Sequence, residues 1–338
     1  MRILSFLAVF GLLVVSPRAT GANQSLTLST LGNYPLGGDT SRYDYQSFDP
    51  TSHRLYIAHL GAGVMRVFDT ENHTVVGTVG GLPGVHGVLA VPELGTVYAT
   101  ATSANAVAAV DPNTLAITAL IPGGEFPDGL AYAPNVGKLY VSDLRAGNDI
   151  VIDTAANAVV ATIPVGGEAG NTQFDGASGQ IFVAVHSGHL VAIDPTTDEV
   201  IGRYETLRCD TPHGLSIDAT RRLAFVACEG NDRLLVMDMD TMQATNTYQV
   251  GRGPDVLAFE PQQGILYVAA EDGVLSVFRV DRFSRGRLDI INRPVAGPNA
   301  HSVSVDTTTG HVFLPTVDIQ GVSVLREMVI ESLGANDD

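Results

Sequence analysis

The same unit recurs seven times along the 338 residues of this chain, and its regular spacing constrains the fold more than any other feature of the sequence. Each unit opens with a polar residue at the start of a short strand, and successive openings are 42, 42, 43, 42, 42 and 46 residues apart. The seven opening residues are Asp44, His86, Asp128, Asn171, His213, Asp255 and His301. Four short strands in a period of about 40–45 residues are typical of one blade of a β-propeller. We therefore predict an all-β fold, a seven-bladed β-propeller with four-stranded blades.

Within each unit the residue types favour strands over helices. Residues 138–143, 222–228 and 265–270 are rich in β-branched and aromatic residues and are bounded by Gly, Pro, Asn and Asp turns. The 36 glycines and 17 prolines are spread along the whole chain, which disfavours a helical bundle. No convincing amphipathic helix separates the strands, and this excludes a two-domain α/β enzyme.

The ring needs one strand from outside the regular repeats. The alternating residues 26–31 precede the first full unit and have no partners of their own. We expect this N-terminal strand to be the outer strand of the last blade, because that pairing removes an exposed sheet edge. The segment 328–333 is the competing candidate for the same place.

The N-terminus has the pattern of an export signal. Met1 and Arg2 are followed by an apolar run over residues 3–15, which is too short to span a bilayer. We predict that residues 1–22 are a secretory signal peptide and that residues 23–338 form a single propeller domain; a core strand at the N-terminus is the alternative. No later segment is long and apolar enough to span a membrane. The sequence thus predicts a soluble exported protein, either periplasmic or secreted.

The charge balance excludes one class of partner. The chain has 36 acidic and 19 basic residues, a net charge of −17, and its one lysine is Lys138. Affinity for nucleic acid depends on Lys and Arg side chains that neutralise phosphates. We therefore expect no nucleic-acid partner.

Several repeat marks resemble a known family. They are Lys138-Leu-Tyr-Val in a second strand, Val151-Ile-Asp-Thr in a third strand, and Val159-Val-Ala-Thr-Ile-Pro-Val-Gly after it. In these marks the chain resembles the YVTN, or YncE-like, propeller family over essentially the whole predicted mature chain. The resemblance implies a propeller fold. It leaves the function open, because such propellers include binding proteins and enzyme domains.

The polar openings are the main candidate site. In a propeller the first strand of each blade lines the central channel, so these residues are expected to form a ring around one channel mouth. His86, His213 and His301 could hold Zn²⁺ or another borderline metal. Asp44, Asp128, Asn171 and Asp255 instead suggest oxygen ligands for an ion such as Ca²⁺, or for another small ligand. Turn chemistry in the repeat is the alternative explanation for these polar residues.

Two further residues are ligand-binding candidates at the same mouth. Arg145 could clamp a carboxylate, with a surface ion pair as the alternative. Glu229 lies in a loop expected beside the ring. His186 and His189 flank a Ser-Gly turn there, and we expect them to be a solvated pair rather than ligands.

The two cysteines are Cys209 and Cys228. Cys209 precedes the first strand of the fifth unit, and Cys228 ends the antiparallel second strand, so both fall on the channel-mouth face. We predict a Cys209–Cys228 disulfide, since disulfides persist in oxidising compartments. Two thiolate metal ligands beside His213 are the competing interpretation.

Three functions remain open from the sequence. The first is an exported propeller, expected to be a monomer, that binds a small molecule, metal ion or protein partner at the channel mouth. The second is a metal-dependent, lactonase-like hydrolase that uses ring His and Asp residues with a divalent metal. The third is a structural scaffold of the cell envelope. Motifs for covalent serine or cysteine catalysis, such as Gly-x-Ser-x-Gly, are absent from the sequence.

Overall fold

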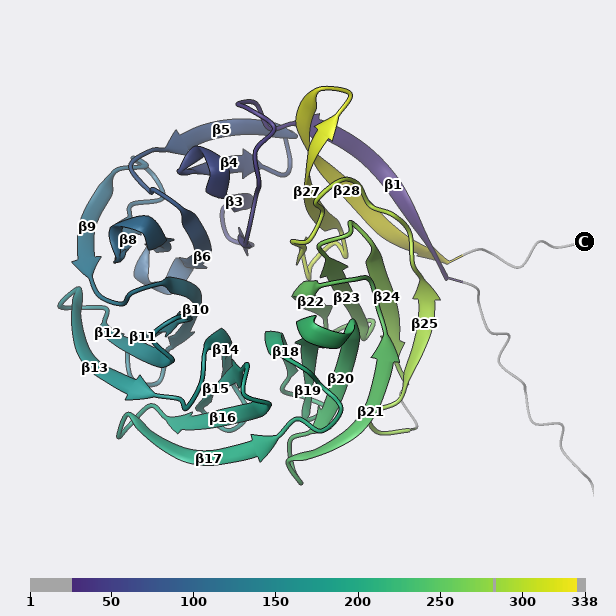
Figure 1. Ribbon diagram of the computed structural model, residues 1–338. Coiled ribbons are helices and arrows are strands. Elements are labelled where there is room, and N and C mark those ends of the chain that lie inside the picture. The colour runs from purple at the N-terminus through teal and green to yellow at the C-terminus, as the bar shows by residue number, and fades with distance from the viewer. Residues whose placement is uncertain (1–25, 282–283, 333–338) are drawn as a thin grey trace, which may run out of the picture.

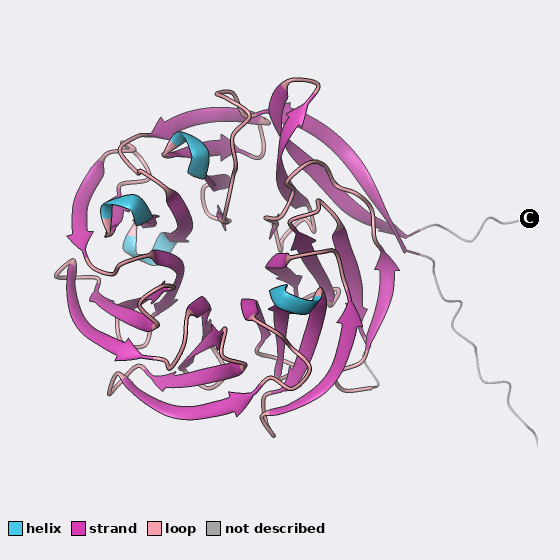
Figure 2. Cartoon of the chain, in the orientation of Figure 1, coloured by secondary structure: helices cyan, strands magenta, loops and turns pink. Residues whose placement is uncertain are grey.

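Seven four-stranded antiparallel sheets stand in a ring around a central channel (Figure 1). The computed structural model describes residues 26–281 and 284–332. Strands and loops make up nearly all of these residues, with four short 3-10 turns (Figure 2). The predicted fold class and blade number are confirmed. The predicted signal peptide over residues 1–22 lies outside the described residues.

Each of the first six blades is a run of four consecutive strands. Blade 1 contains β2 (Gln46–Asp49), β3 (Arg54–His59), β4 (Val64–Asp69) and β5 (Thr74–Val79). Blade 2 contains β6 (Val85–Val91), β7 (Thr96–Ala101), β8 (Ala106–Val110) and β9 (Ile117–Pro122). Blade 3 contains β10 (Pro127–Ala133), β11 (Lys138–Asp143), β12 (Asn148–Asp153) and β13 (Ala158–Pro164).

The next three blades follow the same order. Blade 4 contains β14 (Ala169–Asp175), β15 (Gln180–Val185), β16 (His189–Asp194) and β17 (Glu199–Glu205). Blade 5 contains β18 (Pro212–Asp218), β19 (Leu223–Cys228), β20 (Arg233–Asp238) and β21 (Gln243–Gln249). Blade 6 contains β22 (Pro254–Glu260), β23 (Ile265–Ala270), β24 (Leu275–Val280) and β25 (Leu288–Asn292). The 3-10 turns are η1 (Leu60–Ala62), η2 (Pro92–Leu94), η3 (Thr102–Ala104) and η4 (Glu229–Asn231).

The last blade joins distant parts of the chain. Its strand order is β1-β28-β27-β26, with β1 (Leu26–Pro35), β26 (Ser304–Val305), β27 (Val312–Ile319) and β28 (Val322–Ser332). The strand β1 pairs antiparallel with β28, from Leu26 opposite Ser332 to Pro35 opposite Val324. The N-terminal strand is therefore the outer strand of this blade, as predicted. Residues 328–332 belong to β28 and pair with β1 instead of replacing it.

The hydrophobic core lies between neighbouring blades. One aromatic side chain in the second strand of each blade is at most 2% exposed. These residues are Tyr56, Tyr98, Tyr140, Phe182, Phe225, Tyr267 and Phe313. Each belongs to an apolar cluster that also contains residues of the next blade around the ring. Fully burying a side chain of this size contributes about 1.5–3 kcal/mol, so the ring is held together mainly by these contacts between blades.

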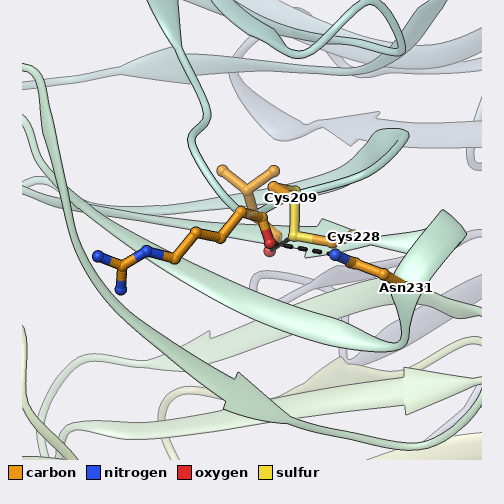
Figure 3. The surroundings of a disulfide bond; sticks show 5 residues. Cys209, Cys228 and Asn231 are labelled. Atoms are coloured by element: carbon orange, nitrogen blue, oxygen red, sulfur yellow. Dashed lines mark hydrogen bonds between the residues drawn. A yellow bond between two sulfur atoms is a disulfide. The ribbon is translucent and has the colours of Figure 1, made fainter.

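The predicted disulfide is present. Cys209 lies in the loop between β17 and β18, and its sulfur is bonded to that of Cys228 at the end of β19 (Figure 3). Asn231 donates a hydrogen bond from Nδ2 to the carbonyl oxygen of Arg208 at 3.2 Å, which holds the same loop from η4. The disulfide ties the entry loop of blade 5 to the second strand of that blade.

Removal of the disulfide is expected to destabilise the fold without changing it. We predict that the C209A/C228A double variant loses about 3 kcal/mol of free energy of unfolding, because the bridge closes a loop of about 20 residues in the unfolded chain. Urea denaturation followed by circular dichroism measures the loss. The wild-type protein under reducing conditions is the matched control and should show the same shift. An unchanged denaturation midpoint in the double variant would contradict the prediction.

A second stability determinant is a buried carboxyl group in blade 3. Asp149 is fully buried on β12, where the equivalent residues of blades 2 and 4 are Val107 and Leu190. Its Oδ2 atom accepts a hydrogen bond from Thr172 Oγ1 at 3.1 Å. Burial raises the pKa of Asp149 to about 7, because the charged form loses its hydration.

This raised pKa predicts a pH-dependent stability. Between pH about 4 and 7 the folded state keeps the Asp149 proton that the unfolded state releases, so stability falls as pH rises through this window. Across this window the free energy of unfolding falls by on the order of 4 kcal/mol because of Asp149. The D149N variant does not show this fall, since an amide does not titrate. We expect the difference in unfolding free energy between D149N and wild type to move in favour of D149N from pH 4.5 to 7.5. Parallel pH profiles from urea denaturation would be inconsistent with this assignment.

Candidate functional site

The strand register defines which residues form the ring at the channel mouth. In five blades the first residue of the inner strand pairs with the last residue of the second strand, as Val85 does with Ala101 and Ala169 with Val185. The next residue of each inner strand is the ring residue. By this register the ring comprises Asp44, His86, Asp128, Gly170, His213, Asp255 and His301.

Blade 4 therefore contributes Gly170 to the ring, and Asn171 lies one position farther along the channel. The reason is steric. A Cβ atom on Gly170 would lie 2.9 Å from both Cα and the carbonyl oxygen of His213. Spacing alone could not distinguish the two registers, because placing Gly170 in the ring only exchanges intervals of 43 and 42 residues for intervals of 42 and 43.

The channel continues beyond the ring as a cavity. It measures about 320 Å³ and is lined by residues of all seven inner strands. Asn171, Gln46, Gln173 and Ser216 supply polar groups to its wall. Asn171, a predicted ligand-binding residue, thus faces this cavity and not the ring.

Three ring residues from neighbouring blades converge in a buried group. The potential ligand atoms of Asp44, Asp255 and His301 all lie within 4.8 Å of one another. His301 Nε2 is 3.9 Å from Asp44 Oδ1 and 3.9 Å from Asp255 Oδ2. All three side chains are buried. This buried triad combines two carboxylates with one imidazole.

The hydrogen bonds of His301 leave one of its lone pairs directed at the carboxylates. His301 Nδ1 lies 3.1 Å from the carbonyl oxygen of Asn299, which can only accept, so Nδ1 carries the proton of the neutral ring. Its Nε2 atom is buried and has no hydrogen-bond partner among the described residues. Burial lowers the pKa of His301, although the carboxylates of Asp255 and Glu271 offset part of this change. A lone pair that faces two carboxylates is unfavourable unless a proton or a metal cation lies between them.

The mouth around the triad is acidic. Burial raises the pKa of Asp44 well above its ordinary value, and the neighbouring carboxylates of Asp255 and Asp128 raise it further. Burial likewise raises the pKa of Asp128. Arg42 offsets part of this charge, with Nη2 at 2.8 Å from Glu271 Oε1 and 3.9 Å from Asp255 Oδ2. One guanidinium thus faces several carboxyl groups, and the raised pKa values of Asp44 and Asp128 reflect how unfavourable a full set of negative charges is here.

A second group lies beside the triad. The potential ligand atoms of His186, His213 and Glu229 also lie within 4.8 Å of one another, and this group is partly exposed. His213 connects the two groups, because its Nε2 atom is 3.5 Å from Asp255 Oδ1. Glu229 was a predicted ligand-binding residue.

The remaining candidates lie apart from both groups. His86 uses Nδ1 for contacts with the carbonyl oxygen of Gly84 at 2.7 Å and with Thr102 Oγ1 at 2.9 Å. The edge of its ring meets Phe126, and the guanidinium of Arg145 lies over the same Phe126 ring, 4.3 Å from its centroid. The structure therefore does not bring His86, His213 and His301 together at one centre among the described residues. His301 and His213 belong to different groups, although both contact the carboxylate of Asp255.

The contacts of three residues at the mouth were not predicted, and His186 was expected to be solvated. Arg42 and Glu271 form an ion pair although they come from blades 1 and 6, and His186 reaches His213 from another blade. No local spacing predicts such contacts, because they form between blades, and the Arg42–Glu271 pair arises only when the ring closes. The available signal was the position of each residue in a loop on the channel-mouth face.

Comparison with known proteins establishes the fold class. No protein-family model and no curated protein matches this chain. Among solved structures it superposes on a chain of hydrazine synthase from Kuenenia stuttgartiensis with a TM-score of 0.72 and 15% identity, covering 92% of this chain and 99% of that chain. At this identity the similarity shows the fold alone. The protein is a seven-bladed β-propeller, and no helix within residues 26–281 and 284–332 is long and apolar enough to cross a bilayer.

Proposed function

We propose that this protein is an exported β-propeller of the YVTN type that binds a divalent cation at its channel mouth, with Asp44, Asp255 and His301 as ligands. The observation that carries the proposal is the buried Nε2 lone pair of His301, which points at two carboxylates and has no partner among the described residues. A buried arrangement of this kind is costly by itself and favourable around a cation.

The donor set restricts the cation. Two carboxylate oxygens and one imidazole nitrogen suit Mn²⁺ or Zn²⁺, since carboxylates favour hard cations and imidazole favours borderline ones. A cation here would also relieve the repulsion between Asp44 and Asp255, which contributes to the raised pKa of Asp44.

Two further observations support the remainder of the proposal. The Cys209–Cys228 disulfide fits a protein exported to the periplasm or the medium, because such bonds are rare in the cytosol. The Lys138-Leu-Tyr-Val and Val151-Ile-Asp-Thr marks support placement among YVTN propellers.

The conservative variant D44N tests the proposed cation site. We expect metal-free wild-type protein to bind one equivalent of Mn²⁺, followed by the electron paramagnetic resonance signal of free Mn²⁺. D44N should bind at least tenfold more weakly, a change of about 1.4 kcal/mol in binding free energy. Without metal, D44N should be at least as stable as wild type, because an amide is cheaper to bury than the Asp44 carboxylate.

The matched control is D289N, which removes the same charge from the outer strand β25, where the side chain of Asp289 is 43% exposed and contacts Arg287. It should bind Mn²⁺ as the wild type does. Absence of Mn²⁺ binding by wild type, or equal affinity of D44N and wild type, would refute the proposed cation site. H301Q should repeat the effect of D44N on affinity.

A further inference from the structure

The partly exposed group beside the triad has its own geometry. His186 follows β15 in the turn before β16, His213 is the second residue of β18, and Glu229 opens η4. These elements belong to blades 4 and 5, so the group shares no ligand with the buried triad. The side chains of His186 and His213 are 17% and 13% exposed, and Glu229 is open to solvent.

A chain of three close contacts runs through the two imidazoles. His186 Nδ1 lies 3.1 Å from Glu168 Oε2, and His186 Nε2 lies 3.0 Å from His213 Nδ1. The other nitrogen of His213, Nε2, lies 3.5 Å from Asp255 Oδ1. Each imidazole therefore has a carboxylate on one side and the other imidazole on the other side.

Protons and a metal cation can each fill the central gap between the two rings. Two neutral imidazoles carry two N–H groups, which satisfy the contacts at 3.1 and 3.0 Å if His186 donates to Glu168 and His213 donates to His186. That arrangement leaves buried Asp255 Oδ1 without a donor and directs a lone pair of His213 Nε2 at it. If each ring instead donates to its carboxylate, two lone pairs face the central gap, and a metal cation bound there satisfies both.

The spacing of the two nitrogens fits a metal, because two nitrogens bound to one tetrahedral Zn²⁺ are separated by about 3.3 Å, given Zn–N bonds of about 2.0–2.1 Å. The observed 3.0 Å is close to this value.

The carboxylates also have the arrangement that metal-binding histidines need. A ligating imidazole usually donates its other N–H to a carboxylate, which orients the ring and fixes its tautomer. Glu168 occupies that place for His186, and Asp255 occupies it for His213. Glu229 then supplies a third ligand atom on the solvent side.

We propose that His186, His213 and Glu229 form a second cation site, selective for Zn²⁺, beside the carboxylate-rich triad. Two imidazoles and one carboxylate are a common donor set for Zn²⁺ sites with an open position. The proposal stands independently of the cation site proposed at Asp44, Asp255 and His301, because no ligand is shared. His213 and Asp255 are nevertheless in contact, so a cation bound at one site changes the electrostatic environment of the other site.

Isothermal titration of the metal-free mature protein with Zn²⁺ tests the second site. We expect H186A to lose one equivalent of Zn²⁺ relative to wild type, or to bind it at least tenfold more weakly. The matched control is H189A, because His189 opens β16 directly after the same turn and contacts only Ser187 Oγ, at 3.5 Å, among the hydrogen bonds found for it. H189A should bind Zn²⁺ as the wild type does. Equal Zn²⁺ binding by H186A and wild type would overturn the proposal.

A second variant and a chemical modification experiment make the outcome of the Zn²⁺ titration unambiguous. D44N should retain the H186A-sensitive Zn²⁺ equivalent, so failure of the first proposed site and failure of the second give different results. Independently of any variant, Zn²⁺ should protect His186 and His213 of the wild-type protein from modification by diethyl pyrocarbonate, read out by mass spectrometry. Unprotected modification at saturating Zn²⁺ would count against the second site even if H186A failed to fold.

Discussion

The packing of one aromatic side chain between each pair of neighbouring blades is the interaction on which the rest of the structure depends. Tyr98, for example, lies in a cluster with Leu130 and Leu139 of the next blade, and Tyr56 lies with Val85 and Val97. Because protein interiors are close-packed, these buried rings set the separation of the blades. That separation places the inner strands around a channel narrow enough for side chains of blades 1, 6 and 7 to approach within 4 Å.

The repeat made the fold predictable, because each blade is specified by local pattern. Aromatic and β-branched residues mark its strands, and turn residues separate them. The disulfide followed from the antiparallel register of blade 5, and the position of β1 followed from the need to cover a sheet edge. The site was predictable only as a ring. Which ring residues meet depends on the width of the channel and on the direction of each side chain. Only the structure could therefore show that His86 lies apart from the group of His301, and that Gly170 holds the ring position predicted for Asn171.

The type of potential metal ligand changes from one side of the channel mouth to the other. The buried triad is rich in oxygen donors, whereas the group of blades 4 and 5 is rich in nitrogen donors. His213 and Asp255 meet at the boundary between them. A sevenfold repeat can generate this asymmetry because only the strand framework is constrained by packing, while the ring position accepts Asp, His or Gly. The residues that differ between repeats therefore determine the chemistry of the site, and the residues that the repeats share determine the fold.

The pairing of β1 with β28 also determines when the buried triad can form during synthesis of the chain. Asp44 lies in blade 1 and His301 in blade 7, on opposite sides of the seam that this pairing closes. During synthesis the ribosome produces Asp44 more than 250 residues before His301 (301 − 44 = 257), and the seam cannot close until residues 322–332 have also appeared. The triad is thus absent from any shorter nascent chain. A cation held there would cross-link the first and last blades, so it would be acquired only by the finished ring and would resist its opening.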